Sequence, residues 1–271
     1  MGSQPQGEII MARTVPVRAA SVAGVVGIVV ALVAGATACG ASAGDDKKPE
    51  QRSFALHGRA LTVDSDDSAI DLVVADSDTV HTVQVTRWFE GHVVVGGDPE
   101  VTWAMEDGDR LVLRMKCSGV VADCSARHRI VVPRGVAVSV ADGDGRVTAR
   151  GFEEALSVRT ADGSVRVTDS SGPLDLRSAD GSISALGVDS RRVRARTQDG
   201  SVRLELGVVP DLVESRSQDG SVTIALPHDF YRVTADSGDG SVDVSVPRDP
   251  ASSHVVSTYT NDGKITVRTA N

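Results

Sequence analysis

The sequence predicts an all-β protein built as a β-solenoid, in which similar rungs of two short strands stack on one another. Three observations predict this fold. A motif of Asp-Gly, a polar residue and then Val or Ile occurs seven times; apolar and polar residues alternate on both sides of it; and only 3% of the 271 residues are aromatic. Such alternation with β-branched residues is typical of strands with one buried face, and a stack of Val, Leu and Ile side chains needs few rings.

The repeat has a period of 18 to 23 residues, measured between the glycines of the motif. Val or Ile stands two residues after each glycine, and Val or Leu stands seven residues before it, so each repeat holds one strand on either side of the Asp-Gly turn. A fixed period of this length indicates a stacked architecture. The seven glycines are Gly145, Gly163, Gly181, Gly200, Gly220, Gly240 and Gly263.

The Asp-Gly pair is suited to a turn, because Asp favours turns and we expect the Gly to supply positive φ. Pro or Gly marks the opposite turn of most repeats and stops the strand there. An antiparallel β-meander, with a hairpin at each Asp-Gly turn, is the alternative. We prefer the solenoid because the columns keep their residue type from copy to copy. It predicts that Val165 contacts Val147 and Ile183, whereas a meander would pair Val158 with Val165.

Residues 133–271 contain the regular Asp-Gly β repeats, and residues 54–132 read as irregular N-terminal β repeats of the same kind. Terminal repeats of a stack are atypical because they close its open end. We expect Trp88, Phe89 and Trp103 to cover the apolar interior there. Alternating runs predict strands at 60–63, 70–74, 80–88, 101–105, 111–115 and 128–132.

Residues 1–39 have the features of a signal peptide. Arg13 and Arg18 precede an uncharged apolar run that ends in small residues directly before Cys39. This end resembles the lipobox of bacterial lipoproteins, in which the Cys is lipidated after cleavage, although Ala36 stands where Leu is usual. We expect a lipid on Cys39 and a mature protein anchored to the outer face of the cell membrane. An uncleaved transmembrane anchor is the alternative.

Residues 40–53 are small or charged and lack periodicity, so we expect a flexible tether between the membrane and the folded domain.

Cys117 and Cys124 are the two cysteines that remain once Cys39 is assigned to lipid. An exported location permits oxidation, and a loop of six residues between strand-like runs can bring two Cα atoms to the spacing of a disulfide. We expect a disulfide between them. Buried free thiols, or a metal with His128 as the nearby third ligand, are the alternatives.

The chain resembles the bacterial DUF4097 family of β-repeat proteins, known as toast-rack or adhesin-like domains. The resemblance runs from about Phe54 to Asn271 and rests on the Asp-Gly-Ser-Val repeats, on residues 131–136 (Val-Val-Pro-Arg-Gly-Val) and on the Cys117/Cys124 pair before them. It implies a β-helical stack at the cell envelope. It implies no catalytic residues.

The sequence shows no arrangement typical of an enzyme, a metal site or a cofactor site. The six His residues are scattered without metal-ligand spacing, and no nucleophile elbow or phosphate-binding loop occurs. One Asp per turn supplies too few oxygens for Ca²⁺. The net charge of -9 argues against a nucleic-acid partner.

A column of arginines stands four residues before the repeat glycines, at Arg159, Arg177, Arg196 and Arg216. In a solenoid it forms a cationic ladder that could bind an anionic cell-wall polymer, since guanidinium groups suit phosphate. The alternative is a solvated face neutralised by Asp175, Glu205 and Glu214. We therefore predict a non-catalytic binding or scaffolding module with an anionic polymer or another envelope protein as partner. An accessory module of an envelope-stress sensing system is the second hypothesis.

Overall fold

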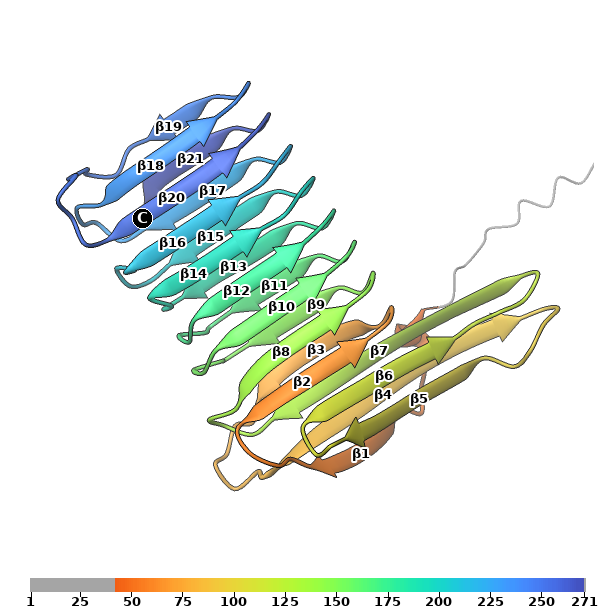
Figure 1. The fold of residues 1–271 in the computed structure, drawn as a ribbon. Helices are drawn as coiled ribbons and strands as arrows, with labels where there is room; N and C mark the ends of the chain where they lie inside the picture. The colour runs from red at the N-terminus through yellow and green to blue at the C-terminus, as the bar shows by residue number, and fades with distance from the viewer. Residues whose placement is uncertain (1–41, 271) are drawn as a thin grey trace, which may run out of the picture. The chain divides into compact units, whose positions relative to one another are not determined.

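The computed structural model describes residues 42–270, and these form a β-solenoid, as the sequence predicts. Two sheets enclose one apolar core (Figure 1). The eleven strands of sheet A are β1 (Glu50–Ala55), β3 (Ala69–Val74), β4 (Thr82–Val93), β7 (Ala122–Val132), β9 (Val147–Arg150), β11 (Val165–Thr168), β13 (Ile183–Val188), β15 (Val202–Leu206), β17 (Val222–Leu226), β19 (Val242–Val244) and β21 (Ile265–Thr269). The ten strands of sheet B are β2 (Ala60–Ser65), β5 (Glu100–Glu106), β6 (Arg110–Lys116), β8 (Ala137–Asp142), β10 (Leu156–Thr160), β12 (Leu174–Ser178), β14 (Arg192–Arg196), β16 (Leu212–Arg216), β18 (Arg232–Ser237) and β20 (Val255–Thr260).

Successive repeats pair in parallel and in register. Val165 on β11 pairs with Val147 on β9 and with Ile183 on β13, as the solenoid requires. Within a regular rung the two strands belong to different sheets, so the Asp-Gly turn joins the sheets and does not close a hairpin. This pairing excludes the meander.

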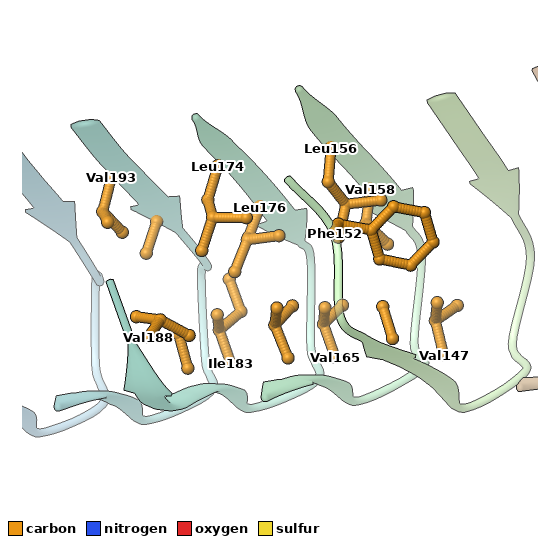
Figure 2. Packing of buried hydrophobic residues seen from close by; sticks show 14 of the residues in the cluster. Val147, Phe152, Leu156, Val158, Val165, Leu174, Leu176, Ile183, Val188 and Val193 are labelled. Atoms are coloured by element: carbon orange, nitrogen blue, oxygen red, sulfur yellow. The ribbon is translucent and has the colours of Figure 1, made fainter. Parts of the chain in front are cut away.

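The core consists of side chains from the predicted columns, interdigitating between the sheets. Val147, Val165 and Ile183 line sheet A, and Leu156 and Leu174 face them from sheet B (Figure 2). These five residues are at most 3% exposed. Burying one Val or Leu side chain stabilises a fold by about 1.5–3 kcal/mol, and the stack repeats that gain at every rung.

The repeat glycines serve a different purpose from the one the sequence suggested. Positive φ is found at other glycines of the described chain, such as Gly151 and Gly187, and not at the seven repeat glycines. A Cβ on Gly181 would instead collide with the carbonyl oxygen of Gly163 on the neighbouring rung, and one on Gly200 with that of Gly181. The glycines are therefore needed because successive turns stack backbone on backbone.

A column of hydroxyls stabilises the same turns from inside. The hydroxyl of Thr197 accepts a hydrogen bond from the N–H of Gly200 (3.3 Å) and donates to the carbonyl of Gly181 on the next rung (2.9 Å). Ser178 and Ser217 make the equivalent pairs of bonds. The glycines and the hydroxyl residues of these turns are buried although the Asp residues are exposed, so the hydroxyls satisfy backbone groups that water does not reach.

The order of rungs in the stack departs from chain order at both ends. The last strands, β20 and β21, lie between the β16/β17 rung and the β18/β19 rung, and the first rung, β2/β3, lies between β6/β7 and β8/β9 (Figure 1). The terminal β18/β19 rung carries the less buried side chains, with Val242 45% exposed, whereas Val256 and Ile265 of the inserted rung are fully buried. Placing the more apolar repeat inside buries more apolar surface.

The tether is shorter than the sequence suggested. Residues 50–53, assigned there to the flexible segment 40–53, belong to β1, which pairs antiparallel with β4. Ahead of it, Ala43–Asp45 form a 3-10 turn (η1) that contacts β4 and β7. Edge pairing uses backbone groups that any residue carries, so the polar composition of the segment conceals it. The predicted signal peptide and lipidated Cys39 lie outside the described residues.

Trp103 covers the core at the N-terminal end of the stack. It is 4% exposed and lies edge-to-face with Phe54, and the guanidinium groups of Arg52 and Arg87 stand 4.6 and 4.8 Å from the centre of its ring. Trp88 and Phe89 are half-buried and lie outside the core cluster. Of the three rings expected to cover the interior, Trp103 is thus the one buried in it.

Across residues 42–270, none of the helical segments is both long and apolar enough to span a membrane.

Candidate binding surface

The four predicted arginines form one straight column on the outer face of sheet B. Arg159 pairs with Arg177, Arg177 with Arg196 and Arg196 with Arg216, on the adjacent strands β10, β12, β14 and β16. Neighbouring strands are about 4.8 Å apart, so the column places one guanidinium at each such step. The alternation of each strand directs these side chains outward, because the flanking residues are the buried ones.

Acidic neighbours neutralise part of this column. Arg177 makes two 3.0 Å hydrogen bonds to the carboxylate of Asp175. Glu214 lies 2.8 Å from Arg194 and 3.8 Å from Arg196. These groups remain between about one third and one half exposed, so such pairs contribute little to stability and can exchange partners.

The two ends of the column are less compensated. The guanidinium carbon of Arg216 lies 4.8 Å from the centre of the Tyr259 ring, a contact that does not neutralise its charge. Arg159 is exposed, and its neighbour on β8 is Ala141. The column therefore presents cationic groups that a ligand can reach.

A hollow of about 630 Å³ runs along the beginnings of the same strands. Small side chains form it, since Ala60 pairs with Ala137 on the adjacent strands β2 and β8, and Ala155 directly precedes β10. The far end of the hollow carries the polar side chains of Asp175, Arg192, Arg194 and Asp211. Sheet B thus has a shallow trough beside a row of arginines, a surface suited to an extended ligand lying across the rungs.

The Asp-Gly carboxylates form a second charged column at the turns. The pKa of Asp180 is raised, first by desolvation and then by the charges of Asp162 and Asp199 on the neighbouring rungs. Within the described part of the chain, no group of three or more His, Cys, Asp or Glu side chains is placed to hold a metal ion.

Two buried titratable residues lie away from this surface. Burial, followed by the charge of Arg87, lowers the pKa of His128 to about 4; this residue packs against Trp103 in the core. Burial raises the pKa of Asp142 to about 7, at the position where the other rungs carry the buried Ser or Thr. Sequence reasoning missed Asp142, although it is the one departure from Ser or Thr three residues before the repeat glycines.

Cys117 and Cys124 form a disulfide in the structure, with their Cα atoms 6.1 Å apart. Sequence analysis missed the feature next to it, a group of four exposed valines at residues 94, 95, 120 and 121. The uncharged runs 93–97 and 117–122 are the signal that could have revealed it.

Three solved structures resemble this chain at 12% sequence identity. A "putative adhesin" from Bacteroides fragilis NCTC 9343 gives a TM-score of 0.49, with 83% of this chain and 98% of that chain covered. A "putative adhesin" from Parabacteroides merdae ATCC 43184 gives 0.43 (83% and 97%), and a "putative cell adhesion protein" from Clostridium sporogenes ATCC 15579 gives 0.34 (82% and 99%).

No curated protein matches the chain. The profile of the family described as Toastrack DUF4097 matches residues 45–270, which is nearly the whole of the described structure. The stacked rungs, the Asp-Gly turns and this match agree, and the chain belongs to the Toastrack DUF4097 family.

Proposed function

We propose that this protein is a non-catalytic binding module at the outer face of the cytoplasmic membrane, and that sheet B binds an anionic polymer of the cell wall. The observation that carries the proposal is the in-register column of Arg159, Arg177, Arg196 and Arg216 beside the trough. A phosphate-rich chain lying along the stack axis meets a guanidinium at each rung, and guanidinium forks bind phosphate oxygens in pairs.

The acidic partners of the column favour a polymer over a single anion. Because Asp175 and Glu214 compete for Arg177 and Arg196, one phosphate gains little at any one rung. Several phosphates on one chain add their contributions once the first has bound, because the later contacts are intramolecular. The net charge of -9 repels polyanions from the rest of the protein, so binding is confined to this face.

The location rests on Cys39 and the segment before it. Replacing Cys39 with Ala should abolish metabolic labelling by a fatty-acid analogue. Labelling that persists in the C39A chain would exclude this residue as the lipid site. An unmodified protein that stays in the membrane fraction without any labelling would instead indicate an uncleaved apolar segment as the anchor.

Polymer binding is tested with a soluble polyglycerol phosphate and two variants of equal charge. The first replaces the four arginines of the column by Gln. The second replaces four arginines on strands of sheet A by Gln, at Arg150, Arg166, Arg203 and Arg268. The first variant should bind about tenfold more weakly, since exposed charge contacts contribute about 0.2–1 kcal/mol each. The second should bind like the unmodified protein.

Equal losses in both variants would show a non-specific charge effect and overturn the proposal. Full binding by the first variant, or no binding by the unmodified protein, would overturn it as well and leave another envelope protein as the candidate partner. Thermal unfolding of each variant checks that the stack is intact.

A further inference from the structure

The arm formed by β4 and β7 ends in an apolar tip. These strands are longer than those of the regular rungs, and they extend past the rest of sheet A (Figure 1). Their antiparallel pairing runs from Gln84 with Val131 to Val93 with Ala122. It continues through hydrogen bonds from the N–H of Val94 to the carbonyl of Val121 and from that of Val120 to the carbonyl of Val95, 2.9 and 2.7 Å long.

Four large apolar side chains of this tip are exposed. The exposed fractions are 62% for Val94, 60% for Val95, 82% for Val120 and 56% for Val121. Residues 93–97 and 117–122 carry no charge, and the charged or titratable residues Asp98, Lys116, Asp123 and His92 border them. An uncharged cap above a charged border matches the boundary between the apolar and headgroup layers of a membrane.

The four valines cap the hairpin beyond the ends of its strands. Residues 94, 95, 120 and 121 form bends after β4 and before β7, and backbone hydrogen bonds join Val94 to Val121 and Val120 to Val95. All four side chains are more than half exposed, so each presents apolar surface to solvent. A lipid phase surrounds a projecting tip and covers all four side chains, whichever way each of them points.

Backbone groups of the tip are hydrogen-bonded across the hairpin, as an apolar medium requires. The bonds of Val94 and Val120, with a bridge between Gly96 and Gly119, pair backbone groups of the tip across the hairpin. Unpaired backbone groups are costly in lipid, so this pairing favours insertion. The Cys117–Cys124 disulfide, with Cys124 opposite Gly91 in the ladder, fixes the loop against the strand beside it.

The described chain begins on this arm and, when traced back toward its start, approaches the tip. Along β1, each step from Ala55 back to Glu50 moves the paired residue on β4 from Thr82 to Arg87, in the direction of Val93. Farther back, the Asp46 carboxylate accepts a hydrogen bond from the N–H of Phe89 (3.1 Å). Val94 lies five residues farther along, or about 17 Å in a strand. The start of the described chain, at residue 42, therefore lies on the same arm as the valines.

We propose that this valine tip is a membrane-insertion element that enters the outer leaflet beside the point where the chain reaches the membrane. It inserts by burying apolar surface, so its contact with lipid is independent of anionic headgroups and of salt. The proposal goes beyond polymer binding on sheet B and does not require it.

The test uses the full-length protein in vesicles of phosphatidylcholine with brominated acyl chains, which quench tryptophan within the membrane. V120W places the probe in the tip, and F230W places it at an exposed site near the other end of the stack. The fluorescence of unmodified protein is subtracted because Trp88 and Trp103 are present in all chains. Quenching should be several-fold stronger for V120W than for F230W, and the V120W emission should shift to the blue.

A third chain, V120W with Val94, Val95 and Val121 replaced by Ser, separates insertion from mere proximity to the membrane. Its quenching should fall to the F230W level while its thermal unfolding is unchanged. Equal quenching in V120W and this chain would overturn the proposal. Two other results with aqueous iodide would also overturn it, both with a V120W probe that stays accessible to iodide in pure lipid vesicles. Protection of the probe only in native envelopes would indicate a protein partner. Protection on raising the protein concentration without lipid would indicate a second copy of the chain. None of these readings depends on polymer binding.

Discussion

The hydroxyl of Thr197 donates to the carbonyl oxygen of Gly181, which belongs to the neighbouring rung and lies 16 residues earlier in the chain. The same hydroxyl accepts the N–H of Gly200 in its own turn. One side chain thus connects two turns, and its equivalents repeat the connection along the stack. The stability of the turns depends on this column as well as on the apolar core.

Replacing Thr197 with Val keeps the volume of the side chain and removes the hydroxyl. The Gly181 carbonyl and the Gly200 N–H then each lose a buried partner, so we expect a loss of about 1–3 kcal/mol in the free energy of unfolding. Urea unfolding followed by circular dichroism measures it. Thr223→Val, a half-buried residue on the outside of sheet A, is the matched control and should change stability by less than about 0.5 kcal/mol. Equal effects of the two substitutions would contradict the role of the hydroxyl.

Replacing Gly200 with Ala should destabilise the stack because the added Cβ would meet the carbonyl of Gly181. The contact is with backbone, which cannot move aside alone, so the rungs must separate locally. Overpacking of this kind costs about 1–3 kcal/mol or more. Gly97→Ala, where the Cβ meets open space, is the control. Because no positive φ is involved at Gly200, Gly200→Ser should be at least as damaging; a tolerated Ser would refute the close approach of the turns.

The pH dependence of stability should contain a contribution from Asp142. Its pKa is about 7 in the folded protein and about 4 in an unfolded chain. Between these values the folded state keeps a proton that the unfolded state has lost, so the free energy of unfolding falls as pH rises through this window. The full effect is at most about 4 kcal/mol, at about 1.4 kcal/mol per unit.

Asp142→Thr should abolish this contribution, because the hydroxyl found in the other rungs carries no charge. We expect the variant to be more stable than the unmodified protein above pH 7 and to approach it near pH 4. Comparing the two proteins at each pH cancels the opposite effect of His128, whose lowered pKa makes the fold less stable as pH falls from about 6.5 to 4. Parallel pH profiles of the two proteins would contradict the assignment.

The Cys117–Cys124 disulfide should affect the arm and leave the stack intact. It closes a loop with a sequence separation of 7, and the entropic gain from so short a loop is at most about 2–3 kcal/mol. Mass spectrometry of the exported protein without reductant should find both thiols blocked to alkylation. In C117S/C124S, hydrogen exchange should quicken at residues 93–97 and 117–122 and stay unchanged in β10 to β17. Two free thiols in the exported protein would rule out the disulfide.

The sequence by itself determined the two-strand structure of each regular rung and the position of the arginine column. The period of the Asp-Gly motif set the number of regular repeats, the alternation separated buried from exposed positions, and the column of Arg159, Arg177, Arg196 and Arg216 followed from the register. These features are local and repeated, so each copy reinforces the same prediction. The strands predicted between residues 60 and 132 follow from the same alternation.

Only the tertiary structure decided which rung lies next to which at the ends of the stack. The backbone of any rung can pair with that of any other, so the motif does not reveal that β20 and β21 lie between the β16/β17 rung and the β18/β19 rung. The balance of apolar burial against exposed ends selects that order. The reason for each glycine, the raised pKa of Asp142 and the exposure of Val94 and Val120 likewise depend on contacts between segments far apart in the chain, which no local pattern encodes.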